Sequence, residues 1–178
     1  MVAPSPNAPR SPTEGPPVTV IARPRTLPTT HVAGPLATAR RLAADDTLWR
    51  PHLDFDPVSR YYRRLLATGE HEAWLLTWLP GQGTPWHDHG GSAGAFVVLQ
   101  GALVERTARH GLVRGPRRIH GRGATHAFGP EYVHRVTNEG SDPAVSLHVY
   151  APRLASMTDY EEDDGVLAPT LVRTAEAW

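Results

Sequence analysis

The sequence predicts a mainly β domain, a small antiparallel barrel or sandwich, preceded by N-terminal helices. From His71 onward, short runs rich in β-branched and aromatic residues alternate with turns that contain Gly or Pro, which is typical of such folds. Before them, residues 36–69 carry apolar side chains at near-helical spacing. The strands we expect are residues 74–79, 95–99, 102–107, 125–128, 133–137 and 145–150.

The chain divides near residue 35. Residues 1–35 hold nine of the 18 prolines and lack a regular hydrophobic period, so we expect a Pro-rich, largely flexible N-terminal segment. Residues 36–178 then form one domain.

Two helices are expected at the start of this domain. Residues 36–49 have the apolar spacing of an amphipathic helix. Asp56-Pro57 offers an N-cap followed by proline at the first helical position, and Gly69 offers a C-terminal stop. Between them lies an apolar stripe of Val58, Tyr61, Tyr62, Leu65 and Leu66.

Two turns and a last strand complete the expected fold. Gly115-Pro116 predicts a turn, and the acidic residues 159–164 predict a solvated turn. The tail up to Trp178 is expected to return as one more strand.

Composition excludes several classes of function. The formal net charge of zero argues against a nucleic-acid partner. The chain contains no cysteine, which rules out disulfides, thiolate ligands and a cysteine nucleophile. No apolar run approaches the roughly 18–20 residues of a membrane span, and no signal-peptide core is visible. We expect a monomeric, cytoplasmic protein without a nucleic-acid or membrane partner.

Three histidines form a candidate metal site. His87 and His89 are two positions apart, so in a strand their side chains point the same way. His134 follows 45 residues after His89, a distance typical of a partner strand in a barrel. Three neutral imidazoles suit iron, zinc, nickel or copper.

The stretches 83–101 and 129–138 around these histidines resemble the two motifs of the cupins. There are two departures: Ala93 and Gly94 stand where a typical cupin has its glutamate ligand, and the proline of the second motif is displaced to Pro130. The resemblance implies a cupin fold, a jelly-roll type of barrel, with three histidine ligands and no carboxylate ligand.

A three-histidine site resembles that of the cysteine dioxygenase family of thiol dioxygenases. The run SLHVYAP, residues 146–152, is similar to the Ser-x-His-x-Tyr segment of this family. Trp78 lies nine residues before His87, and Tyr61-Tyr62-Arg63 lies upstream, where the family has its substrate arginine. The resemblance covers roughly residues 48–157.

This resemblance implies that Arg63 binds the substrate carboxylate, for which a planar guanidinium offers two parallel hydrogen bonds. Arg60, Arg63 and Arg64 would share the second helix, where only one of Arg63 and Arg64 can face inward. The choice of Arg63 follows the resemblance and not the periodicity. An ordinary surface arginine is the alternative.

Ser146, His148 and Tyr150 alternate on one strand and therefore share a face. The resemblance implies catalytic roles for His148 and Tyr150, with Ser146 supporting them and the Tyr150 hydroxyl close to the substrate thiol and O2. A preorganised phenol can stabilise charge that develops on oxygen. A buried structural tyrosine is the alternative.

Three further residues belong to the implied surroundings of the site. In some members of the family a cysteine is crosslinked to the tyrosine; Gly94 takes its place here, so the chain resembles the bacterial type that lacks this crosslink. Trp78 is expected to line or support the pocket, although packing explains it equally well. The resemblance places Met157 near the substrate mouth, although filling of the core is the favoured interpretation for this residue.

The resemblance implies an Fe(II) enzyme that converts L-cysteine and O2 to cysteine sulfinic acid. One alternative is a dioxygenase for 3-mercaptopropionate or another small thiol carboxylate, because Arg63 argues only for a carboxylate. Another is a cupin that binds a metal or small ligand without oxidising it.

Overall fold

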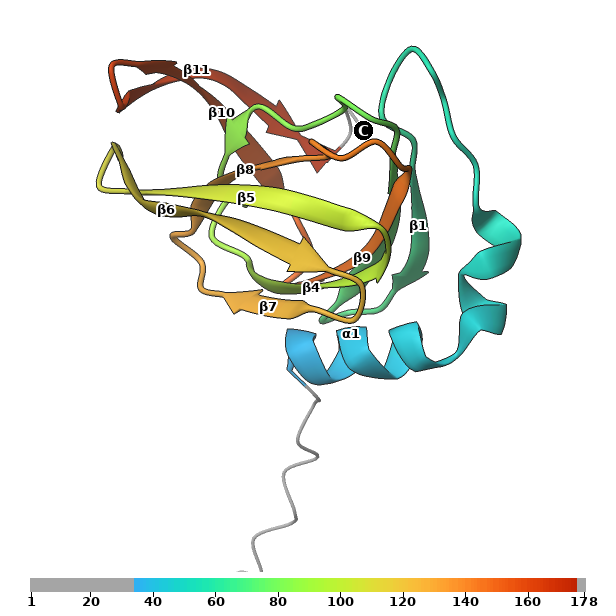
Figure 1. Ribbon diagram of the computed structural model, residues 1–178. Helices are drawn as coiled ribbons and strands as arrows, with labels where there is room; N and C mark the ends of the chain where they lie inside the picture. The colour runs from blue at the N-terminus through green and yellow to red at the C-terminus, as the bar shows by residue number, and fades with distance from the viewer. Residues whose placement is uncertain (1–33, 176–178) are drawn as a thin grey trace, which may run out of the picture. The chain divides into compact units, whose positions relative to one another are not determined.

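The computed structural model describes residues 34–175 (Figure 1). The predicted Pro-rich segment lies outside the described residues except for its last two positions. Among the residues described, no helix is long and apolar enough to cross a membrane.

One α-helix, two 3₁₀ turns and eleven strands make up this part of the chain. The helix is α1 (Pro35–Ala44), and the 3₁₀ turns are η1 (Asp46–Leu48) and η2 (Arg50–His52). The strands are β1 (Tyr62–Ala67), β2 (Glu72–Trp78), β3 (Trp86–His87), β4 (Ala93–Gln100), β5 (Ala102–Arg109), β6 (Leu112–Gly121), β7 (Thr125–Phe128), β8 (Val133–Thr137), β9 (Ala144–Ala151), β10 (Ser156–Asp163) and β11 (Val166–Thr174). All six strands expected from the sequence are present, and β11 is the strand expected in the tail.

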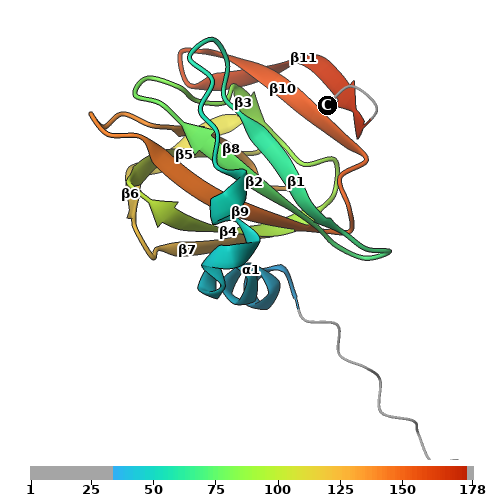
Figure 2. The ribbon, with the colours of Figure 1, turned by 90° about the vertical axis from the view of Figure 1, so that its right-hand side faces the viewer.

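The strands form two antiparallel sets (Figures 1 and 2). The first is a sheet in the order β1-β2-β9-β4-β7. The second has the order β10-β11-β6-β5-β8-β3, and it closes because β3 also pairs with β10. The main apolar core takes side chains from both sets, among them Trp78 and Phe96 from the first and Leu103 and Val136 from the second. The predicted small antiparallel barrel is therefore present.

Helix α1 covers the outer face of the first sheet, below β4 and β7 in Figure 1. It begins with Pro35 at the first helical position, where the missing N–H costs no hydrogen bond. Its buried residues Ala39 and Leu42 pack against Val97, Leu147 and other residues of the sheet. The first predicted helix is thus confirmed, with an end at Ala44 instead of residue 49.

The second predicted helix is wrong, because its residues form the edge strand β1. The Asp56 side chain accepts hydrogen bonds from the N–H groups of Val58 at 2.7 Å and Ser59 at 3.3 Å, which closes a local turn that no helix continues. The backbone of β1 is satisfied instead by antiparallel pairing with β2, with Arg63 opposite Leu75. Long-range pairing overrides the helical spacing of the apolar residues.

Two turn predictions are also wrong. Gly115-Pro116 lies inside β6, where the register against β5 shifts and Gly115 has a φ of 72°, so a bulge accommodates both residues. Most of the acidic run belongs to β10, and only Asp164 and Gly165 turn the chain. Pairing of Asp159 with Arg173 and of Glu162 with Arg106 offsets part of the negative charge of this strand.

Candidate metal centre and substrate pocket

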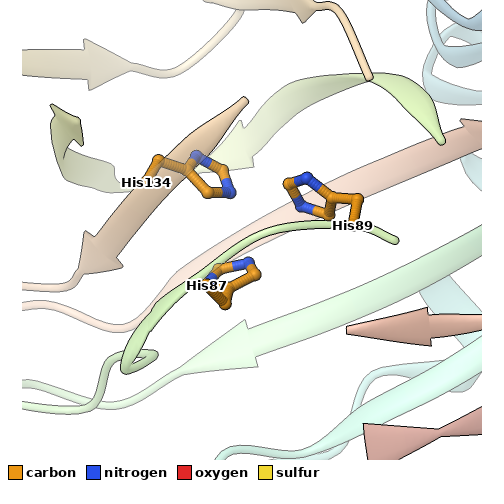
Figure 3. Close-up of side chains that lie close together, drawn as sticks. All are labelled: His87, His89 and His134. Atoms are coloured by element: carbon orange, nitrogen blue, oxygen red, sulfur yellow. The ribbon is translucent and has the colours of Figure 1, made fainter. Parts of the chain in front are cut away.

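The three predicted histidines meet inside the barrel. His87 on β3 is the register partner of His134 on β8, and His89 follows two residues later. Their ring centroids lie 4.6–5.0 Å apart, and one ligand nitrogen from each falls within 4.8 Å of the others. Figure 3 shows the three rings gathered around a common centre. All three side chains are buried.

The hydrogen bonds of these rings leave nitrogens free for a cation. Nδ1 of His87 lies 3.0 Å from the Pro85 carbonyl oxygen, and Nδ1 of His134 lies 2.8 Å from Oε1 of Glu105. Each Nδ1 must donate to its oxygen, so each Nε2 carries a lone pair. Both nitrogens of His89 are buried, and among the described residues neither makes a hydrogen bond of normal geometry, although the Tyr132 backbone lies near enough to the ring to raise its pKa slightly. Unpartnered buried nitrogens are costly, and a metal ion would satisfy them, so the residues fit a metal.

Electrostatics also favour neutral ligands. Burial lowers the pKa of His87 well below its usual value, and His134 lowers it further. Burial, His87 and His134 do the same to the pKa of His89. Neutral imidazole is the form that binds a metal. His87 and His89 are therefore held in the neutral form that a metal site needs.

A cavity of about 120 Å³ borders this cluster. It lies well below the roughly 300–1,000 Å³ of pockets for drug-sized ligands, so it suits a small molecule. The residues around it come mainly from β2, β8, β9 and the segments that flank β1 and β3: Arg60, Tyr62, Trp74, Leu76, Trp78, Thr84, Pro85, His87, His134, Val136, His148, Tyr150, Leu154, Met157 and Arg173.

Arg60 and Arg173 line this cavity, whereas the predicted Arg63 does not. Arg63 is exposed on β1 and does not line the cavity. Arg60 precedes β1, and its guanidinium lies over the rings of Trp78 at 4.7 Å and Tyr62 at 5.8 Å from their centroids. It has no hydrogen-bonded or ion-paired partner among residues 34–175, and burial lowers its pKa. Because a half-buried cation without a counter-charge is unfavourable, Arg60 is suited to receive an anion.

The predicted row on β9 forms one hydrogen-bonded chain. The indole N–H of Trp78 donates to Oγ of Ser146 at 2.9 Å, and this oxygen lies 2.9 Å from Nε2 of His148. The Ser146 hydroxyl has no other acceptor in the described part of the chain, so it donates to Nε2. The proton of His148 then lies on Nδ1, which is 3.4 Å from the Tyr150 hydroxyl oxygen. The hydroxyl hydrogen of Tyr150 remains free for a ligand in the cavity.

Burial keeps His148 and Tyr150 of this chain uncharged. Burial lowers the pKa of His148 to about 3, with a smaller contribution from His134. Burial also raises the pKa of Tyr150 above its usual value, although Arg60 opposes this shift. Tyr150 therefore stays a protonated phenol at neutral pH and can donate its hydrogen.

Gly94 and Met157 occupy different surroundings. Met157 lines the cavity, as Trp78 does. Gly94 does not line it; a Cβ atom at this position would lie 2.5 Å from Cζ of Phe128 and 3.0 Å from Cδ1 of Tyr150. The glycine thus allows the Phe128 and Tyr150 rings to approach the backbone of β4.

Sequence reasoning missed Arg60 and Glu105. Arg60 and Tyr62 are two residues apart and would share a face of an extended segment, a signal that the predicted helix concealed. Glu105 is an acidic residue within the expected strand 102–107, two positions after the buried Leu103, so its side chain faces the interior. A carboxylate on the buried face of a strand is the signal that could have revealed it.

Two antiparallel strand sets, with a His-x-His pair and a third histidine gathered inside the barrel, define a protein of the cupin class with a group of side chains that could hold a metal ion. A Klebsiella pneumoniae protein with a double-stranded β-helix domain superposes with a TM-score of 0.55 at 19% identity, covering 64% of this chain and 94% of its own. A Thermus thermophilus protein gives a TM-score of 0.52 at 25% identity, covering 58% and 93%. The predicted cupin fold is confirmed.

The chain belongs to the cysteine dioxygenase type I family, whose model matches residues 35–163. Human cysteine dioxygenase type 1 is 28% identical over 132 residues, which are 68% of this chain and 66% of the human protein. The zebrafish (Danio rerio) protein of the same name is 30% identical over 128 residues, 66% of this chain and 63% of its own. The match therefore spans slightly less than two thirds of these relatives.

Proposed function

We propose that this protein is an Fe(II)-dependent thiol dioxygenase that converts L-cysteine and O2 to cysteine sulfinic acid. One observation carries the proposal: a buried three-histidine cluster borders the same small cavity as Arg60, which has no ion-pair partner among the described residues. Both oxygen atoms enter the product, so the reaction needs no external reductant. Iron held by His87, His89 and His134 would supply the Lewis acidity that deprotonates the thiol and the redox chemistry for O2.

The side chains around the cavity would orient the substrate. Arg60 binds the carboxylate through its planar fork of N–H donors, and stacking on Trp78 holds the guanidinium in place. Leu76, Leu154 and Met157 supply apolar wall. A substrate fixed at its carboxylate places its thiol toward the histidines, which gains the advantage of orientation.

A second candidate substrate is a thiol carboxylate without an amine, such as 3-mercaptopropionate. None of the residues that line the cavity is Asp or Glu, whereas Arg60 and Arg173 are both present. The ammonium group of cysteine would therefore find no anionic side chain there. This observation favours a carboxylate on the substrate and leaves the amine without a partner from the protein.

Tyr150 is the proposed hydrogen-bond donor to the reacting oxygen. We expect Tyr150→Phe to lower kcat by about 10²-fold, since loss of one preorganised donor to a developing oxyanion costs about 10²–10³-fold. Steady-state O2 consumption measures the change. Tyr61→Phe, which alters a tyrosine that does not line the cavity, should keep the kcat of the wild-type protein. An unchanged kcat in Tyr150→Phe would exclude the role.

The function itself is tested by O2 uptake with the Fe(II)-loaded protein. L-cysteine, 3-mercaptopropionate and cysteamine, which lacks the carboxylate, are compared, and sulfinate is quantified. We expect one sulfinate per O2 with L-cysteine and little uptake with cysteamine. O2 uptake with 3-mercaptopropionate alone would show that the substrate of this protein is a thiol carboxylate without an amine. A fully iron-loaded protein that consumes no O2 with any thiol would refute the oxidative function and favour a cupin that only binds.

A further inference from the structure

Glu105 is a fully buried carboxylate directly behind the metal centre. It lies on β5, which pairs with β8, the strand that carries His134. Its Oε1 accepts hydrogen bonds from Nδ1 of His134 at 2.8 Å and from the Tyr132 hydroxyl at 3.0 Å. Its Oε2 lies 2.9 Å from Nε2 of His120. Three neighbours thus hold both oxygens in place.

The network extends one step beyond the carboxylate. The hydroxyl oxygen of Tyr132, which donates to Glu105, lies 3.0 Å from Nε2 of His126. Phe128 stacks on the Tyr132 ring with centroids 5.0 Å apart and lies 4.7 Å from the ring of His89. The surroundings of Glu105 therefore contact two of the three histidines, one by a hydrogen bond and one through an aromatic ring.

We propose that Glu105 is a positioning residue that holds His134 in its ligand orientation and provides the negative charge of the metal centre. Its hydrogen bond fixes the proton of His134 on Nδ1 and directs the lone pair of Nε2 toward the other two rings. A carboxylate in this position also raises the basicity of the ligand. The inference rests on the proposed metal site but not on the substrate or the reaction.

The position of the charge distinguishes this site from a cupin with a glutamate ligand. Ala93 and Gly94 remove the carboxylate from the ligand set, which alone would leave a divalent cation among neutral rings. Glu105 restores one negative charge, which is separated from the metal position by the imidazole ring of His134. The coordination positions that a ligand carboxylate would occupy stay open, while the charge that stabilises the bound cation is retained.

The substitution Glu105→Gln removes the negative charge of this side chain and keeps its size and shape nearly unchanged. We expect the affinity for Fe(II), measured without O2 by competition with a chromophoric chelator, to fall 10–100-fold, the range for partners of metal-bound histidines. Zn(II) should show the same direction. Glu72→Gln is the matched control, because Glu72 is also buried and accepts a hydrogen bond from the Leu154 N–H at 2.9 Å. It should bind both metals as the wild type does.

The outcomes separate this inference from the proposed metal site. A folded Glu105→Gln protein with wild-type metal affinity overturns the role of Glu105 and leaves the site intact. A wild-type protein that binds Fe(II) and Zn(II) no more tightly than His89→Ala overturns both. Equal losses in Glu105→Gln and Glu72→Gln would show a general effect of altering buried carboxylates and also overturn the inference.

A measurement on the wild-type protein covers the case in which Glu105→Gln does not fold. In the Zn(II)-loaded, ¹⁵N-labelled protein, we expect the His134 ring to carry its proton on Nδ1, with a slowly exchanging, downfield proton resonance. A proton on Nε2, or a fast-exchanging Nδ1 proton, would contradict the hydrogen bond to Glu105 and overturn the inference.

Discussion

Replacing His89 by alanine should weaken Fe(II) binding by more than about a hundredfold, because loss of a ligand exceeds the 10–100-fold cost of losing a ligand's outer partner. Both nitrogens of His89 are buried, and neither makes a hydrogen bond of normal geometry within the described residues. Its ring packs between Phe128 and Tyr150, with centroids 4.7 and 5.2 Å away, so it cannot turn toward solvent. Anaerobic metal titration measures the loss, and O2 uptake should vanish with it.

The control for this variant is His110→Asn. His110 is exposed in the turn between β5 and β6 and has a φ of 52°, a conformation that asparagine also adopts. It should bind one equivalent of iron as the wild type does. If His89→Ala retained iron with wild-type affinity while His110→Asn lost it, the metal centre would not be where the three buried histidines meet.

Arg60→Ala should lower kcat/KM for L-cysteine by roughly 30-fold or more. Removing one partner of a buried hydrogen-bonded charge pair costs about 2–5 kcal/mol, and 1.4 kcal/mol corresponds to a factor of ten. Arg60→Lys should recover only part of the loss, because lysine keeps the charge but not the planar fork. The measurement is the initial rate of O2 uptake at varied L-cysteine concentration, with the iron content of each variant determined beforehand.

Arg63→Ala provides the matched control for Arg60→Ala. The two arginines are three residues apart, but Arg63 is exposed and does not line the cavity. Its removal should leave kcat/KM unchanged, as expected for a surface substitution. The reverse result, a large loss in Arg63→Ala and none in Arg60→Ala, would restore the assignment suggested by the sequence and exclude the role of Arg60.

The three-histidine cluster could be predicted from the sequence because it depends on simple strand geometry. His87 and His89 are separated by the two-residue period of a strand, and the run around His134 is unmistakably β-forming. Their meeting requires only that these two segments be neighbours in a barrel, which the register of His87 with His134 confirms. Local periodicity and one long-range pairing were sufficient.

The arginine could not be predicted in the same way. Tyr61, Tyr62, Leu65 and Leu66 suit one face of a helix and also an edge strand, and only pairing with β2 decides between them. A change from the 3.6-residue period to the two-residue period alters which arginine faces inward. The choice of Arg63 rested on the family resemblance, and the expected helix concealed the alternation that brings Arg60 and Tyr62 to one face.

The negative charge beside the histidines also could not be predicted from the sequence. Three histidine ligands predict an uncompensated cation, whereas the structure places the buried carboxylate of Glu105 at hydrogen-bond distance from one of them. Burial opposes ionisation of Glu105, but hydrogen bonds involving His120 and His134 outweigh it and hold its pKa well below the usual value. No local sequence motif predicts the pairing of β5 with β8 that creates this contact.

The close approach at Gly94 constrains how this site can change over evolutionary time. A cysteine at position 94 is needed before any thioether to Tyr150 can form, yet its Cβ would lie 2.5 Å from the Phe128 ring. In a lineage with this core, a cysteine at position 94 therefore requires the Phe128 ring to shift. A smaller residue at position 128 would remove that contact, so the side chain at 128 influences how readily position 94 can change.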